Sequence, residues 1–78
     1  MNEKSRMIRA LLSEMSPKRA VEYVKAFELP RDEEIYIIER DIRKKSIEQI
    51  ALENYISPET VKRRRRSGYA KIADELNN

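Results

Sequence analysis

The chain has 78 residues, of which 40% are charged and one is glycine, and its formal net charge is +3 at pH 7. A chain of this length buries only about 60% of its surface, so we expect one domain with a modest core. The absence of Cys and His excludes zinc-finger, thiol and imidazole chemistry. No apolar run reaches the length of a membrane span or a signal-peptide core. We therefore expect a cytoplasmic protein that does not enter a membrane.

Two helices are predicted in residues 1–28. The first spans residues 3 to 15, where apolar side chains recur at the spacing of one buried helix face; they are Met7, Ile8, Leu11, Leu12 and Met15. The second begins at Ser16-Pro17, because Ser supplies an N-cap oxygen and Pro suits the first helical position. It runs to about Glu28, and its inward positions are Ala20, Val21, Val24 and Phe27, with Tyr23 at the edge. This pair either completes the core or forms a dimer interface.

The third helix is predicted to begin near Pro30, and its charges match the helix dipole at both ends. Acidic residues fill the first turn, Asp32 to Glu34, and basic residues fill the last, Arg43 to Lys45. The apolar stripe consists of Ile35, Ile38 and Ile42. The three carboxylates could be imagined as a metal site, but stabilisation of the helix end explains them and no His accompanies them.

The fourth and fifth helices complete the predicted fold. Ser46 to Gln49 has the pattern of a capping box and opens a short helix that ends near Glu53. The fifth helix begins at Ser57-Pro58 and runs to about Leu76. Its inner stripe is Val61, Arg65, Gly68, Ile72 and Leu76, and Tyr69 is expected to pack against the third helix. The prediction is an all-α five-helix bundle with no strand.

Residues 46–66 have the order that a helix-turn-helix requires, which is a short helix, a tight turn and a second helix carrying cations. Five consecutive cations, Lys62 to Arg66, supply the local excess of positive charge. The residues predicted to join the two helices are Ile47, Ile50, Ala51, Ile56 and Val61. If Val61 points inward, the opposite face of the fifth helix carries Glu59, Lys62, Arg63 and Arg66.

This outer face is predicted to read the major groove of DNA. Arg63 and Arg66 can each grip a guanine, and Glu59 can accept a hydrogen bond from a cytosine amino group. Ser57 caps the helix and aims its first N–H groups outward, where a phosphate can bind. Phosphate contacts are assigned to the flanking residues Thr60, Arg64 and Ser67, and Lys62 suits either role.

The segment from Leu29 to Leu76 resembles region four of bacterial sigma factors and the related output domains of response regulators. The residues that carry the resemblance are Leu29-Pro30 before an acidic helix start, Ile50-Ala51, Ile56-Ser57 and Thr60-Val61-Lys62. The resemblance implies a small helical domain with a helix-turn-helix that binds promoter DNA and contacts RNA polymerase. It implies that the DNA-facing residues are Ser57, Glu59, Thr60, Lys62, Arg63 and Arg66. The first 28 residues match no pattern of this family.

Three positions depart from the family pattern. Tyr55 stands where family members usually have Gly, and Asn54 stands where they have an apolar residue. Because Asn tolerates left-handed backbone, the turn is expected to shift by one residue, with Tyr55 at the edge of the core. Arg65 replaces an apolar residue, so we expect it to lie along the core or to pair with Glu39 or Asp41.

The leading prediction is a sequence-specific DNA-binding protein, a small transcriptional regulator from a bacterium, phage or mobile element. In this interpretation residues 1–78 form one domain, residues 29–78 are the helix-turn-helix unit that binds double-stranded DNA, and the protein acts as a homodimer. One alternative is a phage packaging adaptor of the small terminase type, which forms rings. Another is a protein-interaction module that docks on RNA polymerase. We expect no enzyme, cofactor or metal, because no catalytic constellation has a recognisable spacing.

Overall fold

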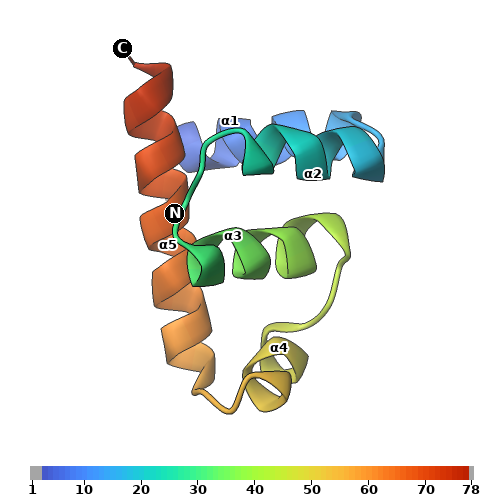
Figure 1. The fold of residues 1–78 in the computed structure, drawn as a ribbon, viewed down its shortest axis with the longest axis vertical. Helices are drawn as coiled ribbons and strands as arrows, with labels where there is room; N and C mark the ends of the chain where they lie inside the picture. Colours follow the sequence, from blue (N-terminus) through green and yellow to red (C-terminus); the bar gives the residue numbers. More distant parts are fainter. Residues whose placement is uncertain (1–2, 78) are drawn as a thin grey trace.

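The computed structural model describes residues 3–77, and within this range the chain forms five α-helices and no strand (Figure 1). The prediction of an all-α protein is confirmed, while the predicted boundaries at residues 1 and 78 lie outside the described residues. The α-helices are α1 (Glu3–Glu14), α2 (Pro17–Lys25), α3 (Arg31–Ile37), α4 (Ile47–Glu53) and α5 (Pro58–Leu76). A π-helical turn, η1 (Ile38–Ile42), continues directly from α3.

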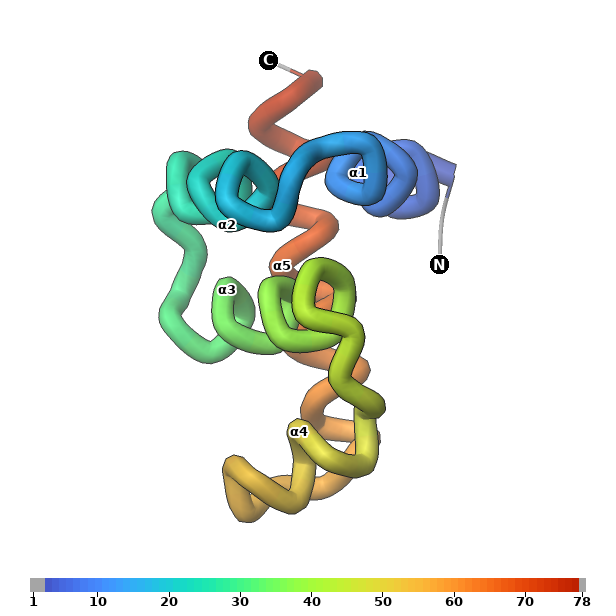
Figure 2. Tube along the Cα trace, turned by 90° about the vertical axis from the view of Figure 1, so that its right-hand side faces the viewer, coloured from blue at the N-terminus to red at the C-terminus, as the bar shows by residue number. Residues whose placement is uncertain are grey.

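The longest helix, α5, runs along the molecule, and the other helices stack beside it (Figure 1). Seen from the side, α1 and α2 lie next to each other across one half of α5, α3 lies at its middle and α4 lies at its start (Figure 2). α5 contacts α1, α3 and α4, whereas α2 packs on η1. The fifth helix is therefore the element that most of the others share.

A serine residue caps the N-terminus of three of the helices, as predicted. The Oγ atoms of Ser16, Ser46 and Ser57 accept the backbone N–H three residues further on, at 3.3, 3.0 and 3.1 Å. Such a cap is worth about 1 kcal/mol compared with Ala. The predicted capping box is only half formed, because the Gln49 side chain donates to Glu53 at 3.3 Å instead of reaching back to Ser46.

The buried side chains form two clusters, and α5 contributes to both. The upper cluster joins α1, α2, α3, η1 and the second half of α5; it contains Ile8, Leu12, Ala20, Val24, Ile37, Ile38, Tyr69, Ile72 and Ala73. The lower cluster joins α3, α4 and the start of α5; it contains Tyr36, Ile50, Ala51 and Val61. The lower cluster includes the residues that were predicted to join the fourth and fifth helices, and Ile47 and Ile56 pack at its edge.

The predicted apolar stripes at the two ends of the chain are too wide. On α1 only Ile8 and Leu12 are buried among the apolar residues, while Met7 is 65% and Leu11 40% exposed. Leu76 is 52% exposed as well, so its place in the inner stripe of α5 is wrong. The physical reason is that α1 meets α5 and η1 along one row of side chains, which leaves the neighbouring row uncovered.

The predicted phase of the third helix is also corrected. Of the predicted stripe, Ile38 is buried, while Ile35 and Ile42 are half-buried against the clusters. The prediction missed Tyr36 and Ile37, which are buried beside Ile38 as consecutive residues. These side chains diverge because α3 lies between the clusters, with Tyr36 in the lower one and Ile37 and Ile38 in the upper one. The wider winding of η1 then shifts the register, and the basic residues 43–45 follow the helix instead of forming its last turn.

α3 and α5 cross closely at Gly68, where a side chain would collide with Ile37 unless Ile37 shifted. A Cβ atom built on Gly68 would lie 2.7 Å from Cδ1 of Ile37 and 3.3 Å from Cβ of Glu33. Because α5 continues through this position as one helix, Gly68 serves close packing and does not mark a break.

We expect Gly68→Ala to lower the free energy of unfolding by about 1 kcal/mol, measured by urea denaturation. The gain of about 1 kcal/mol in helix propensity is smaller than the cost of about 1–3 kcal/mol for overpacking a buried crossing. In an Ile37→Val background, which removes the obstructing Cδ1 atom, the same substitution should be neutral or stabilising. An equal loss in both backgrounds would contradict the proposed steric cause.

Candidate nucleic-acid interface

The rotation of α5 about its axis is set by a buried ion pair. Nη2 of Arg65 lies 2.7 and 2.8 Å from the two carboxylate oxygens of Asp41, and both side chains are at least nine-tenths buried. The Tyr69 hydroxyl donates to the same carboxylate at 2.5 Å, and Nε of Arg9 lies 3.4 Å from it. Of the two partners that the sequence suggested for Arg65, the structure selects Asp41 over Glu39.

The turn between α4 and α5 is closed by a Schellman motif. The N–H of Ile56 donates to the carbonyl of Ala51 at 3.1 Å, and the N–H of Tyr55 donates to that of Leu52 at 3.4 Å. This arrangement requires a left-handed residue after the helix, and Tyr55 fills that place with φ 57°.

Two predictions about the turn are therefore wrong. Asn54 has φ −105°, so the turn is not shifted onto it, and Tyr55 itself adopts the left-handed conformation. The Tyr55 ring is 95% exposed and has no role at the edge of the core. Because a left-handed backbone costs a non-glycine residue about 1–2 kcal/mol, the turn is strained at an exposed side chain.

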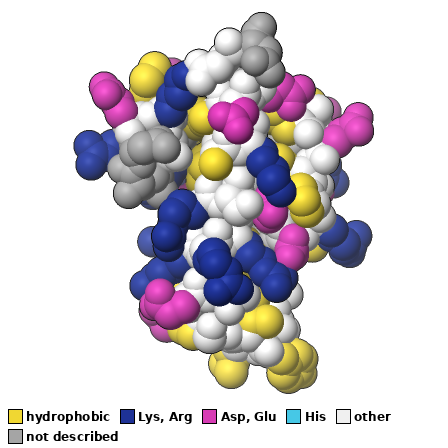
Figure 3. Space-filling model, turned by 90° about the vertical axis from the view of Figure 1, so that its left-hand side faces the viewer, with side chains coloured by type: hydrophobic (Ala, Val, Ile, Leu, Met, Phe, Trp, Pro, Cys, Tyr) yellow, Lys and Arg dark blue, Asp and Glu magenta, His cyan; other side chains and the backbone are white. Residues whose placement is uncertain are grey.

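The four residues predicted for the outer face of α5 lie together on its exposed side. Glu59, Lys62, Arg63 and Arg66 are all exposed, whereas Val61 is fully buried on the opposite side. Lys and Arg side chains gather over this part of the molecule (Figure 3). Nζ of Lys62 lies 3.6 Å from Oε1 of Glu59; the Lys62 side chain is half exposed and that of Glu59 mostly exposed. An exposed pair of this kind contributes little energy, so Lys62 is available to an anion.

The residues predicted for the flanks of α5 have partners within the protein. Nη1 of Arg64 donates to the carboxylate of Asp32 on α3, and Oγ of Ser67 donates to Oε2 of Glu33 at 3.2 Å. The same Glu33 oxygen lies 3.0 Å from Nζ of Lys71. Arg64 and Ser67 are thus turned toward α3, away from the exposed face.

At the start of α5 the polar side chains bond to each other. The hydroxyl groups of Ser57 and Thr60 are 2.9 Å apart, and Oγ of Ser57 also accepts a hydrogen bond from the backbone N–H of Thr60. The eight predicted residues therefore divide into an exposed group of four, a capping pair and two that brace α5 against α3; the exposed group is Glu59, Lys62, Arg63 and Arg66.

The sequence interpretation missed that the start of α1, which carries two arginines, lies beside α5. A hollow between the start of α1 and α5 is lined by Ser5, Lys62, Arg65, Arg66 and Tyr69, and Arg6 and Arg9 follow on the same helix. No local spacing in the sequence connects residues this far apart, so the only available signal was their charge.

No family model, no curated protein and no solved structure matches the chain. Among the described residues, no helix has the length and apolar character needed to cross a membrane. Within residues 3–77 no three carboxylates come together as a set of metal ligands.

We expect Tyr55→Gly to raise the free energy of unfolding by about 1 kcal/mol in urea denaturation, because Gly adopts the left-handed conformation without steric cost. Tyr55→Ala keeps the strain and removes the same exposed ring, so it should change stability by less than about 0.5 kcal/mol. A Gly variant no more stable than the Ala variant would contradict this explanation.

Stability should fall above about pH 10. Burial, reinforced by the charge of Asp41, raises the pKa of the Tyr69 hydroxyl far above its ordinary value. The unfolded chain loses this proton near pH 10 while the folded chain keeps it, so the folded state binds more protons and the free energy of unfolding declines. We expect a slope of up to about 1.4 kcal/mol per pH unit in urea denaturation. Tyr69→Phe removes the titrating hydroxyl, so the free energy of unfolding of this variant should decline less steeply above pH 10. An equal decline with pH in the wild type and the variant would contradict the role of Tyr69.

Proposed function

We propose that α4 and α5 form a helix-turn-helix that binds double-stranded DNA, with the start of α5 in the major groove. The observation that carries the proposal is the division of the cation run, in which Lys62, Arg63 and Arg66 point outward while Arg65 is buried against Asp41. A groove-reading helix needs long polar side chains on one exposed face and a fixed rotation. The burial of Val61 and Arg65 supports that rotation.

In this proposal each exposed residue has a chemical role. Arg63 and Arg66 each donate two hydrogen bonds to O6 and N7 of a guanine, and Glu59 accepts one from a cytosine amino group. Lys62 contacts a base or a phosphate. The N-terminus of α5 adds backbone N–H groups and a partial positive charge for a phosphate oxygen. Arg64 and Ser67 do not contact DNA in this proposal. They bond to α3 and so fix the position of α5.

The proposed biological class is a small transcriptional regulator that acts as a homodimer. The resemblance of residues 29–76 to sigma region four and response-regulator output domains supports this class. Exposed Met7 and Leu11, four residues apart on α1, supply an apolar row for a second copy. A dimer would bind two half-sites separated by about 34–36 Å, which is one turn of DNA.

A second candidate function is docking on another protein such as RNA polymerase. Its supporting observation is the apolar tip beside the start of α5, where Leu52 is 78% and Tyr55 95% exposed. Failure of the protein to bind any duplex at low salt would favour this function. A ring in solution instead of a dimer would favour a packaging adaptor.

The proposal is tested by selecting bound duplexes from a random DNA pool at two salt concentrations. We expect an enriched motif that persists at the higher salt. Arg63→Ala and Arg66→Ala should each relax one position of the motif by about 1–3 kcal/mol of discrimination, whereas Arg19→Ala, an exposed arginine on α2, should leave the motif unchanged. Binding without enrichment that fades steeply with salt would contradict groove reading, since phosphate contacts alone behave in that way.

A further inference from the structure

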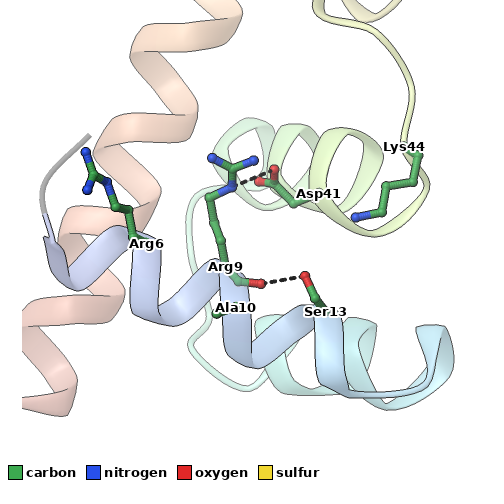
Figure 4. A pocket seen from close by; sticks show the side chains of 6 residues that line it. All are labelled: Arg6, Arg9, Ala10, Ser13, Asp41 and Lys44. Carbon is green, nitrogen blue, oxygen red and sulfur yellow. Dashed lines mark hydrogen bonds and ion pairs between the residues drawn. The ribbon is translucent and has the colours of Figure 1, made fainter.

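A hollow of about 190 Å³ lies between α1 and η1, and three of the residues around it are cations. Its lining consists of Arg6, Arg9, Ala10, Ser13, Asp41 and Lys44 (Figure 4). Arg6 extends toward α5 from one side, Lys44 reaches inward from the other side, and Arg9 and Asp41 meet between them (Figure 4). Since a water molecule occupies about 30 Å³ in the liquid, this α1 hollow has room for a phosphate group and part of its hydration.

The α1 hollow carries a surplus of positive charge. Its single carboxylate, Asp41, already binds Arg65 through both oxygens at 2.7 and 2.8 Å. Asp41 also lies 3.4 Å from Nε of Arg9, and it forms no ion pair with the other two cations of the hollow, Arg6 and Lys44. Neither Arg6 nor Lys44 forms an ion pair within residues 3–77, and both are exposed. An anion that enters the hollow meets two cations whose charge no neighbouring carboxylate compensates.

A second hollow, beside α5, adjoins the α1 hollow. The second hollow, which Ser5, Lys62 and Arg66 line, lies on the other side of the Arg65–Asp41 pair. Asp41 lines the first hollow and Arg65 lines the second, so the pair is their common wall. Cations thus line two neighbouring hollows, one between α1 and η1 and one beside α5. Two neighbouring groups of cations fit a ligand with repeated negative charges better than they fit one small anion.

We infer that the α1 hollow binds backbone phosphates of the duplex whose groove α5 reads. The inference rests on the proposed function and extends the interface from α5 onto α1. Phosphate contacts carry no information about base identity. Arg6 and Lys44 therefore contribute to affinity for every sequence equally, while Arg63 and Arg66 determine preference.

The test compares Arg6→Gln/Lys44→Gln with a control double variant, Lys25→Gln/Arg31→Gln. The control removes the same residue types and the same charge from a hollow lined by α2 and α3, where Glu34 and Glu39 lie beside the cations. Dissociation constants are measured for the selected duplex and a scrambled duplex over a salt series. We expect the Arg6/Lys44 variant to bind both duplexes roughly tenfold more weakly than the control, with the salt slope reduced by about 2.

The outcomes separate the inference from the proposed function. If the Arg6/Lys44 variant binds like the control while Arg63→Ala still relaxes preference, the inference is overturned and the proposed function stands. If the wild-type chain binds no duplex at low salt, both are overturned. If the Arg6/Lys44 variant binds weakly but Arg63→Ala and Arg66→Ala change nothing, the hollow binds phosphates and groove reading is wrong.

A charge-preserving variant controls for unfolding. Arg6→Lys keeps the cation and should bind within about twofold of wild type. If Arg6→Lys loses as much affinity as Arg6→Gln while thermal melts of both remain native, the effect of residue 6 does not come from its charge, and the inference is overturned.

Discussion

Arg65 belongs to a run of five cations, yet it points into the protein. Asp41 holds its guanidinium at 2.7 Å, and the Tyr69 hydroxyl bonds to the same carboxylate. Removing one partner of a buried pair leaves an uncompensated charge, which costs about 3–5 kcal/mol. This cost keeps α5 in a single rotation. Val61 then lies inside, and the side chains on the far side of the helix remain in solvent.

The same fold prevents the cation run from behaving as a block of like charges, which would repel itself and favour disorder. Asp41 neutralises Arg65 and Asp32 pairs with Arg64, so two of the five charges are compensated from α3 and η1. The close crossing at Gly68 brings α3 within reach of these pairs. The remaining positive charge is concentrated on one face instead of surrounding the helix, as a directional interface requires.

Local chemistry made much of the fold predictable, because a serine cap or an apolar spacing acts within one or two turns. The bounds of α5 and the exposure of Arg63 and Arg66 followed from Ser57-Pro58 and a buried Val61. The errors arose where distant segments meet. The partners of Arg64 and Ser67 are 32 and 34 residues away in sequence. Met7 and Leu11 are exposed because of the way in which α1 lies across α5, and no local sequence pattern determines that arrangement.

The position of α5 in the chain has a consequence for how the protein is made. It is the last of the five helices to leave the ribosome, and it contributes side chains to both clusters. Until residues 58–76 emerge, the sides of α1, α3 and α4 that face α5 remain uncovered. Neither cluster can be completed before α5 has been made, because α5 supplies side chains to both.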